Sequence, residues 1–366
     1  MSEFIPTCVL VTGGAGFIGS NFIRWVLAHD PRVRIVNLDA LTYAGNVENV
    51  ADVRARHGAA GDGRYFFLHA DVRDFDAAER ALGGAAVEAR ADGGRAVPAP
   101  DAVVHCAAET HVDRSILAPA TFVETNVHGT LTMLEACRAT WGGGADHAGA
   151  RLLHVGTDEV YGSLGPNDPP TPESAPLAPS SPYAASKAAA DLLVRAWVHS
   201  FEFPAIIARP SNTYGPYQFP EKLIPLMITR ALTDHPLPVY GDGEQVRDWL
   251  NVADCVVALW ELLRRGRCGA IYNVAGKTER KNVDVVRLVL RALGKPESLI
   301  RLVRDRPGHD RRYAMDSRSI ERELGWRPTC SFEAGLAATV EWYVTHRPWW
   351  ERVVDEAYRA ASALYL

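Results

Sequence analysis

In the first half of the chain, short apolar runs rich in β-branched residues alternate with longer stretches that have helical periodicity. Runs such as VVHCAA are apolar on both sides, which is typical of a parallel strand covered on both faces. The alternation predicts an α/β fold of the Rossmann type, with a doubly wound parallel sheet. Strands are predicted at residues 8–13, 33–39, 64–71, 101–108, 151–157 and 205–211, and helices between them, notably at 19–30 and 122–140.

The pattern changes after about residue 211, where proline and aromatic residues become frequent and a short strand is predicted at 270–276. We expect residues 1–211 to form the sheet domain. Residues 212–366 are expected to form mainly a smaller α/β lobe, interleaved with the last strands of the sheet. Gly- and Ala-rich stretches at 57–63, 83–100 and 141–150 offer little to bury, so surface loops or partial disorder are expected there.

Composition narrows the class of partner. The chain of 366 residues has 47% hydrophobic residues and a net charge of -5, which argues against nucleic acid or an anionic membrane as the main partner. No run reaches the roughly 18 apolar residues of a membrane helix, and no basic region precedes the first apolar run, so a secretory signal is not expected. The 6 cysteines are scattered, which predicts reduced thiols in a cytoplasmic protein and no metal site.

The stretch VTGGAGFIGSNF follows the first predicted strand and opens a helix, with Gly13, Gly16 and Gly19 in the spacing GxxGxxG. Glycine allows a tight turn and lets the backbone approach a pyrophosphate, whose charge the helix N-terminus then meets. Asp39 ends the next predicted strand, where its carboxylate can accept from a ribose hydroxyl and would repel a 2′-phosphate. The pattern therefore predicts a dinucleotide site that favours NAD over NADP.

Two further strand ends face the same predicted crevice. Asp71 and Val72 lie where an adenine edge would be expected. Ala107 and Ala108 follow the fourth strand, where small side chains would let the cofactor pass. For the paired alanines, simple good packing is an equally open interpretation.

Tyr183 and Lys187 are four residues apart in a helix that Ser181 would cap and Pro182 would begin. An ammonium beside a phenol favours the phenolate, so we expect Lys187 to lower the pKa of Tyr183 from about 10 and make it a base for a sugar or alcohol hydroxyl. Thr157 would supply a hydroxyl that shares the substrate's proton.

Asp158 and Glu159 directly follow Thr157. Adjacent carboxylates in a closed site push one pKa upward, which would give one acid and one base. Adjacent residues of an extended strand point in opposite directions, so both reach one substrate only if the chain turns there. On these residues alone, a solvated loop edge is the favoured explanation.

The glycine loop, Asp39, Thr157, Tyr183 and Lys187 resemble the extended short-chain dehydrogenase/reductase superfamily. The stretches NLDALTYAGN, ETHVDRSI, TDEVYG, NTYGPYQFPEKLIP and RPGHDRRYAMD narrow the resemblance to the nucleoside-diphosphate-glucose 4,6-dehydratases, above all those that use dTDP-glucose. The resemblance covers nearly the whole chain apart from the three Gly- and Ala-rich stretches. Gly156, where many relatives have serine, and Pro210, where cysteine is frequent, depart from the pattern.

The resemblance implies tightly held NAD, a dTDP-glucose substrate and a homodimer formed through the helix that starts at Tyr183 and the one at 122–140. It implies Asp158 as acid and Glu159 as base, with Lys222, Arg247 and Arg306 on the diphosphate and Tyr240 on the nucleobase. The implied catalytic residues are Thr157, Asp158, Glu159, Tyr183 and Lys187. The implied cofactor-binding residues are Gly13, Gly16, Phe17, Ile18, Gly19, Asp39, Thr42, Asp71, Val72, Ala107, Ala108, Tyr183, Lys187 and Asn212. The implied substrate-binding residues are Thr110, His111, Asn212, Lys222, Leu223, Tyr240, Arg247, Asn282, Arg306 and His309.

Three alternatives stay open. The same chemistry could act on UDP-glucose or another nucleotide sugar. A nucleotide-sugar 4-epimerase would need no elimination pair, so the Thr-Asp-Glu triplet disfavours it. A catalytically inactive NAD-binding or redox-sensing protein could keep the glycine loop, but it should have lost Tyr183, Lys187 or the carboxylates.

Overall fold

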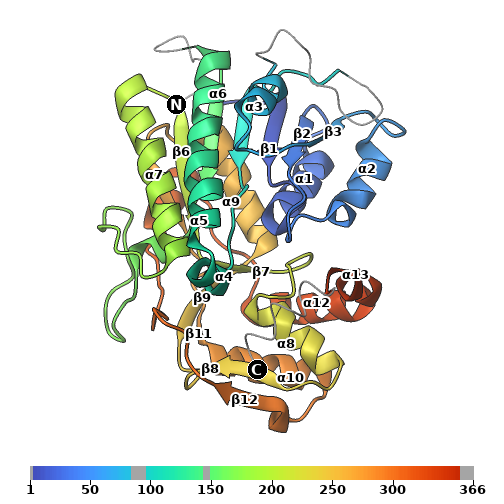
Figure 1. Cartoon of the computed structure of the whole chain (residues 1–366), viewed down its shortest axis with the longest axis vertical. Helices are drawn as coiled ribbons and strands as arrows, with labels where there is room; N and C mark the ends of the chain where they lie inside the picture. Colours follow the sequence, from blue (N-terminus) through green and yellow to red (C-terminus); the bar gives the residue numbers. More distant parts are fainter. Residues whose placement is uncertain (1–2, 84–95, 143–148, 355–366) are drawn as a thin grey trace.

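The computed structural model describes residues 3–83, 96–142 and 149–354. A 7-stranded parallel sheet, with strands in the order β10-β6-β5-β4-β1-β2-β3, lies at the centre of its larger part (Figure 1). All the predicted strands of this sheet are confirmed, although several end one to three residues earlier than predicted. The strands are β1 (Cys8–Thr12), β2 (Arg34–Asp39), β3 (Tyr65–His69), β4 (Ala102–His105), β5 (Arg151–Val155), β6 (Ala205–Pro210) and β10 (Ile271–Val274).

Both faces of the sheet are apolar because successive side chains point to opposite sides. In β1, Val9 and Val11 belong to one buried cluster, whereas Cys8 and Leu10 belong to the other. The first face is covered by α1 (Phe17–His29), η1 (Val47–Val50), α2 (Ala51–His57), α9 (Val252–Arg265) and α11 (Arg318–Leu324). The second face is covered by α3 (Phe75–Ala81), α6 (Gly129–Trp141) and α7 (Pro182–Phe201). The segment that leads into α6 comprises α4 (Val112–Leu117), α5 (Pro119–Phe122) and a π-helix, η3 (Val123–His128).

A smaller lobe lies beyond one end of the sheet, in the lower part of Figure 1. Its core joins Ile224, Trp249, Val286, Leu336 and other apolar side chains. Its strands are β7 (Asn212–Tyr214), β8 (Leu237–Tyr240), β9 (Val246–Asn251), β11 (Glu279–Lys281) and β12 (Ile300–Val303). Its helices are α8 (Leu223–Leu232), α10 (Asn282–Leu293), η6 (Glu297–Leu299), α12 (Phe332–Thr345) and α13 (Arg347–Val353).

The chain returns to the main sheet after entering this lobe. β10 pairs with β6 as the edge strand, and α9 packs against α1 on the first face. We therefore propose residue 211 as a boundary in sequence only, because later segments complete the first core.

Of the three Gly- and Ala-rich stretches, the one at 57–63 is confirmed as a surface loop: α2 ends at His57 and residues 59–62 are exposed turns. In the other two stretches, residues 84–95 and 143–148 lie outside the described residues. Within the described ranges, no helix is both long and apolar enough to cross a membrane.

Candidate active site

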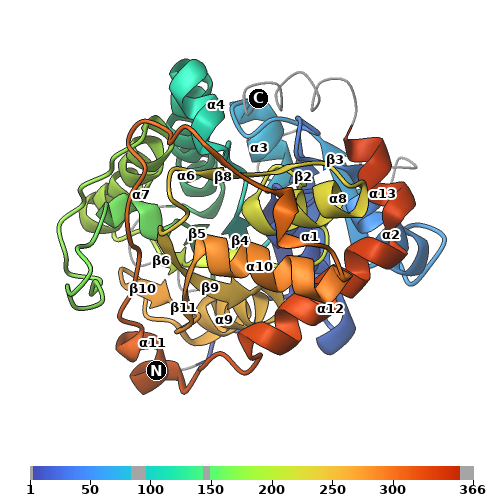
Figure 2. The ribbon, with the colours of Figure 1, turned by 90° about the horizontal axis from the view of Figure 1, so that it is seen from below.

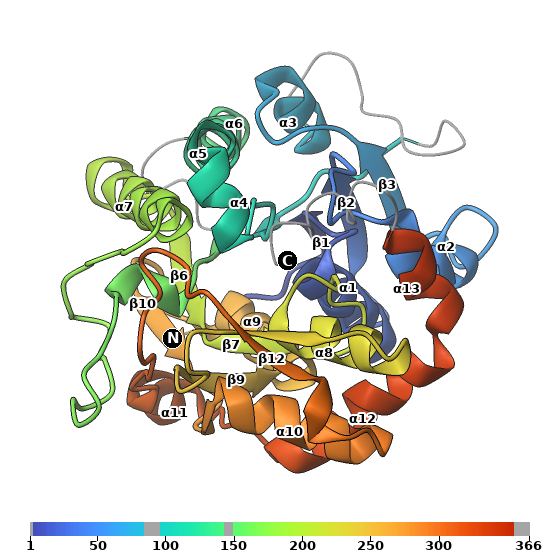
Figure 3. The same cartoon turned by 60° about the horizontal axis from the view of Figure 1, so that its bottom comes forward.

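A cleft of about 330 Å³ opens at the carboxyl ends of the main strands. The strand order reverses there, because β2 and β3 lie on one side of β1 while β4, β5, β6 and β10 lie on the other. In doubly wound sheets, ligands bind at such a switch point. In Figure 3 the molecule is turned so that the smaller lobe, at the bottom of Figure 1, comes forward.

The glycine loop lines this cleft, and its backbone leaves room for a pyrophosphate. Gly13 has φ +68°, and a Cβ there would meet the Ala107 backbone at 2.8 Å. A Cβ on Gly19 would meet the Gly13 carbonyl oxygen at 2.3 Å. Gly16 is the N-cap of α1 and offers no side-chain cap, so the first N–H groups of this 13-residue helix stay available to an anion.

Asp39 ends β2 and lines the cleft. Its Oδ2 accepts from the Ala15 N–H and its Oδ1 from the Leu41 N–H, each at 2.8 Å. A carboxylate has about four lone-pair sites, so acceptor capacity remains for ribose hydroxyls. This donor and acceptor set fits the predicted NAD.

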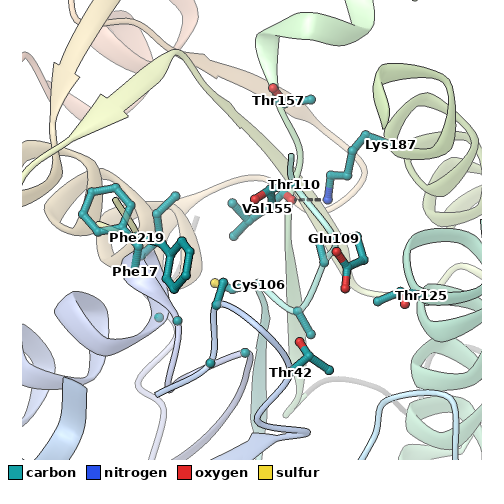
Figure 4. Close-up of a pocket in the computed structure, with 18 of the residues that line it drawn as sticks. Phe17, Thr42, Cys106, Glu109, Thr110, Thr125, Val155, Thr157, Lys187 and Phe219 are labelled. Atoms are coloured by element: carbon teal, nitrogen blue, oxygen red, sulfur yellow. Dashed lines mark hydrogen bonds between the residues drawn. The ribbon is translucent and has the colours of Figure 1, made fainter. Parts of the chain in front are cut away.

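Every predicted catalytic and cofactor residue lines this one cleft. Figure 4 shows Phe17 and Phe219 on one side of it, and Lys187, Glu109 and Thr125 on the other. β3 ends at His69, two residues before its predicted end, and Asp71 is ion-paired with Arg73 at 2.7 Å. The predicted residues that line the cleft are Gly13, Gly16, Phe17, Ile18, Gly19, Asp39, Thr42, Asp71, Val72, Ala107, Ala108, Thr110, Thr157, Asp158, Glu159, Tyr183, Lys187, Asn212 and Lys222.

The chain turns directly after Thr157. Residues Asp158–Tyr161 form a 3-10 helix, η5, whose N-cap is Thr157, and the Thr157 hydroxyl accepts from the Glu159 N–H at 3.3 Å. The turn removes the extended geometry that would separate Asp158 from Glu159. Both carboxylates line the cleft, which excludes the solvated loop edge as their explanation.

The surroundings of the two carboxyls differ. Burial raises the pKa of Asp158 far above its usual range, and the Glu159 charge raises it further. The pKa of Glu159 is also raised, mainly by burial, although Arg306, Lys222 and Arg247 lower it in part. Asp158 is 3% exposed, and its Oδ2 has no hydrogen-bond partner among the described residues. These surroundings favour a protonated Asp158 with one unbonded oxygen, whereas three nearby cations oppose protonation of Glu159.

Tyr183 and Lys187 lie on one face of α7, which Ser181 caps by accepting from the Ala184 N–H at 3.1 Å. The expectation that Lys187 lowers the pKa of Tyr183 is wrong for this structure. Burial raises that pKa, and Glu159 raises it further, while the Thr157 hydroxyl lowers it. The Lys187 ammonium donates instead to the Val155 carbonyl oxygen at 2.7 Å (Figure 4).

A buried polar network beneath these residues was not predicted. Asp191 lies one turn beyond Lys187 on α7 and accepts from the Arg209 Nε at 2.7 Å. Arg209 also donates to the Tyr161 hydroxyl at 2.7 Å. A Cβ on Gly156 would meet Asp191 Oδ1 at 3.0 Å, so this glycine gives Asp191 its space. Asp191 follows Lys187 by four residues, a spacing that places both on one face of the helix and could have indicated Asp191 from the sequence.

The remaining predicted substrate residues do not line the main cleft. Tyr240 and Arg306 meet at Asp113: the Tyr240 hydroxyl donates to Asp113 Oδ2 at 2.9 Å, and Arg306 lies 3.6 Å from Asp113 Oδ1. The rings of Tyr240 and His309 meet edge to face at 5.9 Å.

Arg247 is buried and donates to the Asp310 carbonyl oxygen at 3.0 Å. Lys222, which does line the cleft, donates to the Thr110 carbonyl oxygen at 2.6 Å. The other three predicted substrate residues lie at helix starts: His111 is the N-cap of α4, Leu223 begins α8 and Asn282 begins α10.

Tyr43, Glu109 and Glu221 also line the cleft and were missed. The Tyr43 hydroxyl donates to Glu221 Oε1 at 3.0 Å, and burial raises the pKa of Glu221 to about 7. Each of the three lies inside a stretch on which the family resemblance rests, so the signal was present in the sequence.

Comparison with known proteins shows which family this chain resembles over most of its length. The GDP-mannose 4,6 dehydratase model matches residues 10–339. The chain is 48% identical to dTDP-glucose 4,6-dehydratase of Xanthomonas campestris pv. campestris (strain B100), over 96% of this chain and 97% of that one. It is 47% identical to the enzyme of the same name from Neisseria meningitidis serogroup B, with the same coverage. The structure of DesIV, a dTDP-glucose 4,6-dehydratase from Streptomyces venezuelae with NAD bound, superposes with a TM-score of 0.84 at 46% identity and covers 94% of this chain and 99% of that one.

Gly13→Ala tests the glycine loop. We expect it to lower NAD affinity about tenfold or more, because roughly 1.4 kcal/mol of strain suffices for that factor. Gly294→Ala is the matched control, since Gly294 has φ +63° but no atom within 4 Å of the added Cβ. Calorimetric titration with NAD measures both variants. Equal NAD affinity in the two would contradict the role of close backbone approach.

Proposed function

Because the chain belongs to the GDP-mannose 4,6 dehydratase family, we propose that it is an NAD-dependent dTDP-glucose 4,6-dehydratase. The observation that carries the proposal is the turn at η5, which brings Asp158 and Glu159 into the cleft that holds Tyr183 and Lys187. A simple alcohol oxidation needs only the threonine, tyrosine and lysine. Removing water needs a further acid and a further base.

The residues that would hold NAD are the glycine loop at the pyrophosphate, Asp39 at the adenosine ribose and Lys187 and Asn212 toward the nicotinamide end. When bound, NAD would accept a hydride from C4 of the sugar and later donate a hydride to C6, and the positive charge of its oxidised form would favour the Tyr183 phenolate.

Tyr183 and Thr157 act first, on the 4-hydroxyl of the glucose. Tyr183 takes the hydroxyl proton as C4 is oxidised to a ketone, and Thr157 shares the hydrogen bond. The low exposure of Tyr183, at 7%, and of Thr157, also at 7%, keeps this proton out of bulk water. Lys187 lies on the same helix face and holds the strand end that leads to Thr157 through its bond to Val155.

Glu159 and Asp158 act next. The 4-keto group acidifies the C5 hydrogen, which Glu159 removes as a base. Asp158 gives its proton to the departing 6-hydroxyl, so that water leaves and a C5–C6 double bond forms. The pKa of Asp158 is raised far above its usual range, which suits an acid that must hold its proton. The pKa of Glu159 is raised by burial as well, but Arg306, Lys222 and Arg247 oppose its protonation, which suits the base. A proton then returns to C5 as C6 is reduced, which gives dTDP-4-keto-6-deoxyglucose and leaves no net oxidation.

The second lobe is proposed to hold the nucleoside diphosphate. Lys222, Arg247 and Arg306 supply positive charge in a chain with a net charge of -5, and arginine and lysine both suit phosphate oxygens. Tyr240 and His309 would face the nucleobase, and Thr110, His111, Leu223, Asn212 and Asn282 would surround the sugar and diphosphate. UDP-glucose stays the nearest alternative substrate.

We also propose that the protein is a cytoplasmic homodimer. Its cysteines are all free thiols, which suits a reducing compartment. α7 packs beside η3, and Leu192 of α7 and Val123 of η3 are 51% and 54% exposed. Exposed apolar side chains on neighbouring helices suit contact with a partner copy.

The substrate is tested with purified protein and dTDP-glucose, UDP-glucose or dTDP-galactose. We expect dTDP-glucose to lose one water, which mass spectrometry and NMR of the product detect. Among the three sugars, dTDP-glucose should have the highest kcat/KM. Tyr183→Phe should lose activity by about 10²–10⁴-fold as a catalytic control. Formation of dTDP-galactose without loss of water would favour an epimerase, and no reaction with any sugar would refute a dehydratase.

The roles of the carboxyls are separated by Glu159→Gln and Asp158→Asn. In D₂O, we expect Glu159→Gln to keep NAD bound and some C4 oxidation but to lose exchange of the C5 hydrogen with solvent. Asp158→Asn should keep that exchange and lose elimination, with kcat lower by about 10²–10⁴-fold in both variants. Wild-type exchange in Glu159→Gln would show that another group is the base.

The dimer surface is tested by Val123→Glu combined with Leu192→Glu. We expect light scattering to show a monomer, because charges would be buried without partners at the interface. Leu302→Glu is the control, since Leu302 is 63% exposed on β12 of the other lobe. A dimer that persists in the double variant would place the interface elsewhere.

A further inference from the structure

A chain of buried hydrogen bonds links α13, the last helix of the described residues, to the glycine loop. The Trp349 indole N–H donates to Asn49 Oδ1 at 2.8 Å, although the two residues are 300 positions apart. The Asn49 amide in turn donates to the Ala15 carbonyl oxygen at 2.8 Å. Trp349, Asn49 and Ala15 are 6%, 2% and 0% exposed, so water does not compete for these bonds.

Ala15 lies between two glycines of the loop, and both of its backbone groups are held. Its N–H donates to Asp39 Oδ2 at 2.8 Å, and its carbonyl also accepts from the Asn46 N–H at 3.1 Å. The peptide unit is planar, so the direction of the Ala15 carbonyl fixes the direction of the Gly16 N–H. The Gly16 N–H donates to the Gly13 carbonyl oxygen at 3.1 Å, so the Ala15–Gly16 peptide closes the turn of the glycine loop. Gly16 is also the N-cap of α1, the helix N-terminus where the pyrophosphate is expected.

The far end of this chain is anchored in the smaller lobe. The Trp349 ring lies 5.0 Å from Trp342 and 5.9 Å from Tyr217, each close to edge-on. Figures 2 and 3 show α12 and α13 running from this lobe to α2 of the larger part. Hydrogen bonds from the smaller lobe, which is proposed to hold the sugar nucleotide, therefore help to fix the glycine loop.

We propose that Trp349 and Asn49 are positioning residues for the cofactor: they fix the Ala15–Gly16 peptide and so slow the loss of NAD. The inference rests on the proposed use of NAD. An ordinary helix contact would stabilise the fold without any selective effect on NAD. Trp350 allows the two to be told apart, because its indole N–H is also buried and donates at 2.8 Å, but to the Tyr343 carbonyl oxygen within the smaller lobe.

The experiment compares Trp349→Phe with Trp350→Phe, each of which keeps a ring and removes one buried donor. NAD release from the purified holoenzyme is followed by dilution and chromatography, and rebinding is measured by calorimetry. We expect NAD to bind about three- to tenfold more weakly in Trp349→Phe, the loss typical of one hydrogen bond, with little change in Trp350→Phe. The KM for the sugar nucleotide at saturating NAD should not change.

Asn49→Asp provides a second variant if Trp349→Phe folds poorly. It keeps an acceptor for Trp349 but replaces the donor to the Ala15 carbonyl, so it should also weaken NAD binding relative to Trp350→Phe. The proposal is overturned if Trp349→Phe and Trp350→Phe release NAD alike, or if Asn49→Asp binds NAD as the wild type does. A wild type that binds no NAD would instead refute the proposed function.

Discussion

Because all strands of the main sheet run in the same direction, their carboxyl ends meet at one edge, and the site depends on this constraint. Gly13 follows β1, Asp39 ends β2, Ala107 follows β4 and Thr157 follows β5. Residues more than a hundred positions apart thus share one cleft. No loop has to reach far to bring them together, because the sheet itself sets their spacing.

The two lobes also depend on each other electrostatically. Glu159 belongs to the sheet domain, whereas Arg247, Arg306 and Lys222 follow residue 211. A buried charge without a partner is costly, and several such charges on one surface would be more so. The attraction between Glu159 and these cations therefore links the two lobes, and it lowers the pKa of Glu159 against the effect of burial.

Periodicity and short-range chemistry predicted the parts of the molecule that are local. The seven strands, the glycine loop and the Ser181 cap follow from residue type and spacing along a short segment. The pKa of Tyr183 was mispredicted because burial depends on what packs over α7, while the four-residue spacing reveals only its neighbour Lys187. The pairs Asp191–Arg209 and Asn49–Trp349 join separate elements, and no periodic pattern indicates which polar side chains will meet across a core. The grouping of Tyr240 and Arg306 around Asp113 depends likewise on how the lobes face each other.

The edge position of β10 matters while the chain is being synthesised. β6 leaves the ribosome well before β10, so its outer edge has no strand to pair with during that interval. α9, which covers part of the first face, also emerges only after β9. An open strand edge beside an uncovered apolar face is a template for pairing with another chain. The nascent protein thus has an open sheet edge while the segment between β6 and β10 is being translated, and chaperone binding in that interval would cover it.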